Sequence, residues 1–439
     1  MRKFWLDCVF ATGFVFLALW GLFGLTQLRI FNAFDSLGEA LEDVELTDYV
    51  FQSLRDEPNV DENIVLVNIG NLNRRQIAEQ LTIISKYNPR VIGIDGFFDC
   101  KGRPYDTVSC APLRDVLGNM MLSEAIKAAG NVVLVTHLLK NDTTLAENEF
   151  DTLRRSDPSF RDYALAEGFA TLETGAAFQD DVKTCRSLTP VMVVGDSAHR
   201  AFSVELALAY DSVRTSNFLR RGNYSEVINY RGNVFDVQGT TNYPQMFYTL
   251  DVDDVFNENF VSEMIKDKVV IFGYLGSYLG DPSWDDKFYT PLNKKLAGKA
   301  NPDMFGAVVH ANVVSMILNE DYVETMPAWQ EVAMAIIICL LNVALFSVIN
   351  THLPLYYDGI TKLLQLIQLL AYSTLMVLIF HWYTFKLDIT ITLAAVALVG
   401  DVFEVYMSVI KNLYLKILGR FSLTRKPDGV LTPETPEKQ

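Results

Sequence analysis

The sequence predicts an α/β extracytoplasmic domain with a mostly parallel sheet, plus four transmembrane α-helices, one N-terminal and three C-terminal. Four long apolar runs stand near the two ends of the 439-residue chain, at residues 4–30, 329–349, 363–385 and 389–410. Between the first run and the others, short β-branched runs alternate with amphipathic stretches. That alternation is typical of a parallel sheet with helices on its faces.

The first apolar run follows Arg2 and Lys3 and is too long for the core of a signal peptide. No small-residue cleavage site follows it. Because a bilayer core of ~30 Å needs ~20 apolar residues, we expect an uncleaved transmembrane helix here. The three later runs have comparable length and predict three further crossings.

Basic residues flank the outermost runs and predict the orientation of the chain. Arg2 and Lys3 precede the first run. The segment directly after the last run has five basic residues and no acid; they are Lys411, Lys416, Arg420, Arg425 and Lys426. Both termini are then cytoplasmic, and the large middle segment is periplasmic or extracellular. We expect a membrane helix at residues 1–30, an outer domain at residues 31–327 and three membrane helices at residues 328–410. A short tail follows at residues 411–439, basic at first and then disordered.

The middle segment begins with strand and helix patterns in alternation. The stretches "NIVLVNIG", "PRVIGIDGFF" and "NVVLVTHLL" predict buried strands. Helices are predicted between them at "NRRQIAEQLTIISKYN", where Ile77, Leu81, Ile84 and Tyr87 lie near helical spacing, and at "SEAIKAAG". Further along we expect a helix at "RAFSVELALAYD", strands at "SEVINYRG" and "KDKVVIFGYLG", and a helix at "MFGAVVHANVVSMILNEDY" that leads into the second span.

Composition and motifs argue against several functions. The net charge of −16 makes nucleic acid a poor partner. The sequence contains no Walker A loop, HExxH, CxxC or GxSxG motif, so we expect no enzyme activity, metal site or cofactor. Cys100 and Cys110 flank a short polar loop and are candidates for a disulfide, with two free thiols as the alternative. Cys185 is expected to be buried rather than reactive.

The order of several motifs resembles the type-two CHASE domain, a sensory extracellular domain of bacterial cyclases and histidine kinases. The motifs are "DKVVIFGYLG", "DKFYTP" and "MFGAVVHANVVSMIL", followed by a proline and three apolar runs. Earlier segments agree, among them "ELTDYVFQSLR" and "EGFATLETGAAFQDDVKTCRSLTPV", so the resemblance covers roughly residues 35–385. It implies a multi-pass protein of the bacterial inner membrane whose partners include the lipid bilayer.

The chain departs from this family in two places. The family usually has an acid just after the first core strand, where this chain has "NIGNLNRRQ". The family also usually continues into a cyclase, kinase or phosphatase domain, whereas this sequence ends about thirty residues after its last apolar run. We therefore expect any receiver of a signal to be a separate protein.

Six residues are candidates for a ligand site, five that follow predicted strands and His310 on the helix that comes next. Ligands bind outside the carboxyl ends of the strands in an open parallel sheet, and acids in such a crevice suit hard cations. The alternative is that these side chains cap loops and helices, with the histidine an ordinary interior residue. The candidates are Asp95, Asp281, Asp285, Asp286, Thr290 and His310.

Polar residues also occur inside the predicted membrane helices. Asp401 and Glu404 lie three residues apart and share one helix face. They could lie near the cytoplasmic interface, pair with a basic group on another helix, or form a proton or ion site. Asn342, Gln365 and Gln368 could form hydrogen bonds between helices, or simply pack within the bundle.

Three functions fit the sequence. The first is a sensor or receptor subunit that detects a ligand or partner and signals through its membrane helices to a separate protein. The second is a structural subunit of a multi-protein envelope complex that uses the sensor fold as a scaffold. The third, an outer-surface hydrolase, depends on the acids alone. The small-molecule ligand is not specified by the sequence, and other envelope or membrane proteins are the expected partners.

Overall fold

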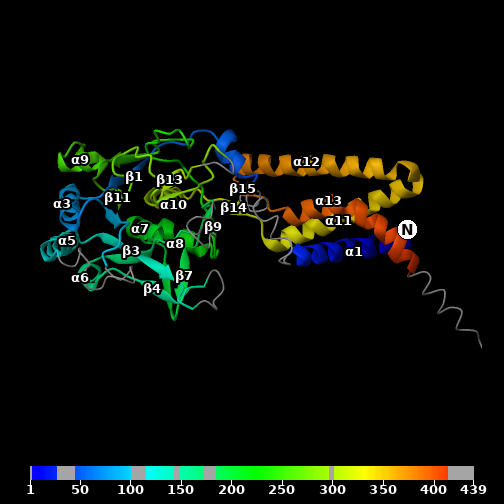
Figure 1. Ribbon diagram of the computed structural model, residues 1–439, viewed down its shortest axis with the longest axis horizontal. Helices are drawn as coiled ribbons and strands as arrows, with labels where there is room; N and C mark the ends of the chain where they lie inside the picture. The colour runs from blue at the N-terminus through cyan, green and yellow to red at the C-terminus, as the bar shows by residue number, and fades with distance from the viewer. Residues whose placement is uncertain are drawn as a thin grey trace, which may run out of the picture. The chain divides into compact units, whose positions relative to one another are not determined.

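The computed structural model describes residues 2–26, 45–99, 115–142, 149–172, 184–295 and 301–413 (Figure 1). The chain divides into two compact units. The helical unit comprises Met1–Asp35, Thr325–Ile379 and Lys386–Gln439, and the α/β unit comprises Ser36–Glu324 and Phe380–Phe385. Cys100 and Cys110 lie outside the described residues, so their disulfide stays a prediction.

The α/β unit is built on one large sheet. In the described residues the strand order is β10-β1-β11-β2-β3-β4, and β5 also pairs with β3. Every pairing is parallel except β3 with β4, which agrees with the mostly parallel sheet expected from the sequence. The strands are β1 (Asp61–Asn68), β2 (Val91–Ile94), β3 (Val132–Leu139), β4 (Thr152–Arg154), β5 (Ala166–Phe169), β10 (Phe247–Leu250) and β11 (Val269–Gly273).

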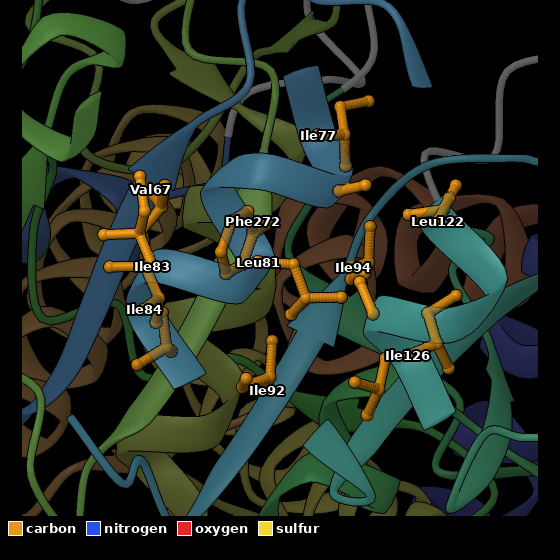
Figure 2. Close-up of a cluster of buried hydrophobic side chains, with 14 of the residues drawn as sticks. Val67, Ile77, Leu81, Ile83, Ile84, Ile92, Ile94, Leu122, Ile126 and Phe272 are labelled. Carbon is orange, nitrogen blue, oxygen red and sulfur yellow. The ribbon is translucent and has the colours of Figure 1, made fainter. Parts of the chain in front are cut away.

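One face of the sheet packs against α3 (Arg74–Ser85) and α5 (Val116–Ala129). The core between these layers includes Leu81 and Ile126 from the helices and Ile92 and Phe272 from the strands (Figure 2). The helix α3 starts where the sequence signals it, because Asn73 and Gln76 form a capping box. The short α9 (Val252–Phe256) and α6 (Pro158–Arg161) complete this side of the unit.

The opposite face packs against α7 (Phe202–Tyr210) and α10 (Gly306–Asn319). Two strand glycines allow this close approach. A Cβ on Gly93 would lie 2.7 Å from Phe202 Cζ, and a Cβ on Gly273 would lie 2.3 Å from Ala307 Cβ. The helix α8 (Ser212–Arg220) follows α7 and contacts α10.

Short strand pairs and single turns make up the remaining elements. The strand predicted at "SEVINYRG" is wrong beyond two residues, since only β9 (Glu226–Val227) pairs. The reason is that Asn312 of α10 binds the following backbone, accepting from the amides of Arg231 and Gly232 at 2.7 and 3.1 Å. The remaining elements are β6 (Ser187–Leu188), β7 (Val191–Val194), β8 (Ser197–Arg200), β12 (Lys287–Phe288), β13 (Met304–Phe305), β14 (Glu324–Thr325), β15 (Phe385–Lys386), η2 (Val50–Leu54) and η3 (Ser262–Met264).

Four helices in the described residues are long and apolar enough to cross a membrane. They are α1 (Arg2–Thr26), α11 (Ala328–His352), α12 (Tyr357–Tyr383, preceded by η4, Pro354–Tyr356) and α13 (Thr390–Val405, continued by η5, Tyr406–Ile410). Side chains of α1, α11 and α13, such as Val15, Phe346 and Val399, form their common core.

The third apolar run, placed at roughly residues 363–385, lies in a helix that begins earlier, since α12 starts at Tyr357. The charged Lys362 therefore lies within α12. In the structure its amino group is 2.8 Å from the carboxylate of Asp401 on α13. An ion pair of this kind lowers the cost of placing a basic residue in a membrane helix.

Candidate functional site

The carboxyl ends of β1, β2 and β11 meet at one edge of the sheet, because these strands are parallel neighbours. The buried Asn68 ends β1 and organises this edge. Its side-chain oxygen accepts hydrogen bonds from the amides of Gly70 and Leu275 at 2.9 and 3.0 Å. Its side-chain nitrogen donates to Asp251 at 2.8 Å and to the Gly276 carbonyl at 3.1 Å.

Asp251 extends this connection to the loop that follows β11. Its second carboxylate oxygen accepts from the Leu279 amide at 3.0 Å, and its first caps α9. Neither Asn68 nor Asp251 was predicted from the sequence to belong to this edge. The stretch "VNIG" could have indicated Asn68, because a side-chain amide at the end of a buried strand must find hydrogen-bond partners.

Asp95 and Asp286 are the two candidate acids that the structure brings close together. Asp95 follows β2 and lies beside Gly273 at the end of β11. Burial, and secondly the nearby charge of Asp286, raises the pKa of Asp95 to about 7. The carboxylate of Asp286 lies beside Gly306, the first residue of α10, and local desolvation there raises its pKa to about 6, although the residue as a whole is exposed. The expected juxtaposition of acids after β2 and β11 is therefore present for this pair.

The other two acids of the loop have different roles. Asp281 accepts hydrogen bonds from the amides of Ser277 and Ser283, both at 2.8 Å, and these bonds hold its pKa below the usual range. Asp285 is exposed, and its backbone amide donates to the Ser283 hydroxyl at 3.1 Å. Asp281 thus matches the alternative interpretation, in which the acids shape the loop.

Thr290 is buried and binds Asp303, a residue that the sequence analysis did not single out. Asp303 immediately precedes β13 and also accepts from the Asn293 side chain at 3.2 Å. Burial raises the pKa of Asp303 to about 7, against the opposing effect of these hydrogen bonds. Thr290 therefore holds the residues after β12 next to those before β13. The sequence "NPDMF" around Asp303 does not distinguish this buried acid from an aspartate in a surface turn.

His310 lies on α10 in the interior of the α/β unit. Its ring packs edge-on against Phe202 at 5.3 Å between centroids, and burial lowers its pKa to about 4. It is therefore a neutral core residue near pH 7. Within the described parts of the chain, no three His, Cys, Asp or Glu side chains gather as a metal site.

One protein-family model matches most of the chain. The CHASE2 domain model matches residues 14–345, from within α1 to within α11. The chain belongs to the CHASE2 domain family. No curated protein and no solved structure matches the chain significantly. CHASE2 is a family of sensory domains, which assigns a sensory character to the α/β unit described above.

In this CHASE2 protein, a polar seam joins α12 to α13 within the helical unit. Gln365 donates to the backbone carbonyls of Val396 and Ala397 at 2.8 and 2.9 Å. The Tyr357 hydroxyl donates to the Gly400 carbonyl at 3.2 Å. Lys362 pairs with Asp401 in the same seam, which is the second of the three interpretations of that acid.

The other polar membrane residues behave differently. Asn342 donates within its own helix, to the Ile338 carbonyl at 3.0 Å. The side-chain oxygen of Gln368 has no partner in the described part of the chain. Glu404 is exposed on α13. A second ion pair joins Asp7 of α1 to Lys411 at 2.8 Å.

The far end of α12 belongs to the α/β unit of the CHASE2 protein. Residues Phe380–Phe385 are counted in that unit, whereas the helix up to Ile379 is counted in the helical unit. The buried Phe380 packs against Phe51 of η2 at 5.5 Å between ring centroids. The Thr384 carbonyl accepts from the Glu324 amide at 3.1 Å. One continuous helix is thus part of both units.

Proposed function

We propose that this CHASE2 protein is a non-enzymatic bacterial membrane sensor. Its α/β unit lies outside the cytoplasm, detects a ligand or a partner, and signals through the membrane helices to a separate protein. The sensory character of the family supports detection. The four apolar helices and the basic residues at both ends of the sequence support the membrane topology.

The observation that supports signalling through the helices is that α12 contributes residues to both the helical unit and the α/β unit. At one end, Phe380 is packed against Phe51 in the α/β unit. Nearer its start, Gln365 is bonded to the backbone of α13. A displacement of η2 would therefore act directly on α12, and through the polar seam on α13. Coupling of this kind needs contiguous packed elements, which α12 provides.

Hydrogen exchange can test this route without knowledge of the stimulus. The full-length protein in lipid nanodiscs is compared with Phe51→Ala, which removes the ring that contacts Phe380. We expect faster amide exchange at the end of α12 and also in α13, beyond the seam. Val213→Ser, at an exposed position on α8, is the matched control and should leave both helices unchanged. Changes confined to the neighbours of Phe51 would refute coupling through α12.

A second experiment separates the sensor from the alternative, a structural subunit of an envelope complex. The full-length protein is purified from its native membrane in mild detergent, and co-purifying proteins are identified by mass spectrometry. A single kinase, cyclase or regulator in the preparation would support a sensor with a separate receiver. A stoichiometric set of envelope proteins would instead support the structural subunit. Purification of the protein alone would contradict both.

A further inference from the structure

Two loops of the α/β unit expose large apolar side chains. Phe235 and Val237 are 47% and 64% exposed, and Tyr278 and Trp284 are 56% and 59% exposed. We call these four residues the aromatic patch. Exposed apolar residues that gather on one surface mark interaction sites more often than scattered ones do. Tyr and Trp are also the residues most enriched at interaction hot spots.

The two loops are packed together. A Cβ on Gly280 would lie 2.5 Å from Val237 Cγ2 and 3.1 Å from Phe235 Cε1, so the second loop lies directly on the first. The Gln238 side chain donates to the Pro282 carbonyl at 3.4 Å. The four apolar residues therefore belong to adjoining loops, although they are separated by up to about fifty positions in the sequence.

Each loop is also held by its own acid. Asp236 accepts from the Thr241 amide at 2.9 Å in the first loop. In the second loop, Asp281 accepts from the Ser277 and Ser283 amides. Loops held in this way lose little conformational entropy when they bind a partner, because they are already ordered. The acids of "GDPSWDD" thus shape a loop that presents Tyr278 and Trp284.

The two loops that carry the aromatic patch contain acids and no Lys or Arg, although the exposed Lys294 lies beside the first loop, where its amide donates to the Thr240 carbonyl at 2.8 Å. Asp236, Asp281 and the exposed Asp285 belong to the same two loops. Lys287 is the basic residue nearest to them in the sequence, but its amino group donates to the Asp281 carbonyl at 3.1 Å and lies 4.6 Å from the Phe305 ring centroid. The surface therefore combines aromatic faces with acidic groups. Like charges disfavour an anionic lipid surface and the same patch of a second copy.

We infer that the aromatic patch is a docking surface for a polypeptide segment that presents Arg or Lys beside apolar side chains. Guanidinium and ammonium groups are attracted both to aromatic faces and to carboxylates. The apolar neighbours of such a cation would cover Val237 and Phe235. The inference rests on the proposed function, since it names the kind of partner that the α/β unit detects.

Peptide selection on the full-length protein tests this surface. A random dodecapeptide library is selected on the protein in nanodiscs of zwitterionic lipid, and enriched peptides are resynthesised for affinity measurements. We expect enriched peptides to combine Arg or Lys with apolar residues. Trp284→Ala and Tyr278→Ser should each weaken binding about tenfold or more, the effect of losing a hot-spot side chain. Asp285→Asn should weaken binding less, and should reduce its dependence on salt.

Matched controls separate the patch from general effects on the protein. Val237→Ser changes an exposed valine in the patch, and Val261→Ser changes a valine of similar exposure outside it, 59% against 64%. Only Val237→Ser should reduce binding, and both variants should unfold at the temperature of the native protein. Enrichment of acidic or uncharged peptides, no enrichment, or equal binding by the patch variants would overturn the inference.

The result is independent of the test for the proposed function. If Phe51→Ala alters exchange in α13 but no basic peptide binds the patch, the sensor stands and this docking surface is refuted. If basic peptides bind the patch but exchange changes remain local to Phe51, docking stands and signalling through α12 is refuted. Binding to vesicles of anionic lipid that is lost in Trp284→Ala would identify a membrane surface and overturn a polypeptide partner.

Discussion

The buried carboxylate of Asp303 accepts two hydrogen bonds from Thr290, from its backbone amide at 2.9 Å and from its hydroxyl at 2.6 Å. The Thr290 hydroxyl also accepts from the Leu292 amide at 3.3 Å. This relationship joins the chain just after β12 to the chain just before β13, and β13 leads directly into α10. A residue proposed as a ligand contact from the sequence is therefore a structural one with a measurable contribution.

Removing the Thr290 hydroxyl should destabilise the protein. Thr290→Val keeps the shape of the side chain but leaves a buried carboxylate oxygen and a buried amide without their partner. We expect a loss of about 1–3 kcal/mol in the free energy of unfolding. Denaturant or thermal unfolding of the full-length protein in detergent measures it. Thr290→Ser keeps the hydroxyl and should lose much less, so equal losses in the two variants would contradict a role for this hydrogen bond.

Stability should depend on pH through the buried carboxyl groups. An unfolded aspartate titrates near 3.9, whereas the pKa of Asp303 in the fold is about 7. Between these values the folded protein holds the proton more tightly than the unfolded chain does. The free energy of unfolding should therefore fall as pH rises from about 4 to about 7, and then level off. Asp95, with a pKa of about 7, acts in the same direction, whereas the exposed Asp286 should contribute less because solvent screens its charge.

Asp303→Asn tests the contribution of one of these groups. The variant should show a shallower decline of stability between about pH 4 and pH 7, by at most about 1.4 kcal/mol per pH unit. Thermal unfolding at several pH values measures the slope. Asp285→Asn, at an exposed position, should leave the slope unchanged. Equal slopes for Asp303→Asn and the native protein would contradict this assignment.

The contact between α10 and the sheet should not tolerate a methyl group at Gly273. In Gly273→Ala the new Cβ would lie 2.3 Å from Ala307 Cβ, and neither group can rotate away. Overpacking of this kind costs about 1–3 kcal/mol or more. Gly96→Ala, whose nearest neighbour would be Ile94 Cγ2 at 4.0 Å, is the control and should unfold near the native temperature. A neutral Gly273→Ala would show that α10 can shift on the sheet.

The polar seam should stabilise the packing of α12 on α13. Gln365→Leu removes two hydrogen bonds to the backbone of α13 while keeping a similar volume. Because hydrogen bonds between membrane helices contribute modestly, we expect a loss of about 0.6–2 kcal/mol in detergent. Leu366→Ala, on the exposed face of the same helix, should be close to neutral in unfolding experiments. Equal stability of Gln365→Leu and the native protein would argue that the seam is dispensable.

Much of the fold follows from local sequence patterns. The β-branched runs at β1, β2, β3 and β11 predicted buried parallel strands, and the spacing of Ile77, Leu81 and Ile84 predicted the face of α3 that enters the core. These predictions are sound because side-chain periodicity of 2 or 3.6 residues reports directly on which faces are buried. The strand predicted at "SEVINYRG" is confirmed only for β9, because at Arg231 and Gly232 a side chain of α10, not a neighbouring strand, binds the backbone.

The candidate site was less predictable. The proximity of Asp95 and Asp286 follows from parallel strand order, which was an assumption until the pairing of β2 with β11 was seen. Asp303 and Asn68 were not distinguishable from ordinary polar residues in the sequence. Their importance comes from burial, and burial of a single polar side chain depends on distant segments that pack around it.

The sequence by itself determined the membrane character of this protein, the α/β class of its large unit and its family, because apolar run length, periodicity and motif order are local properties. Only the tertiary structure decided that Asp281 and Thr290 support loops, and that Lys362 joins Asp401. It also decided that α12 belongs to both units. These facts depend on contacts between residues far apart in the chain, and such contacts exist only after the elements have packed.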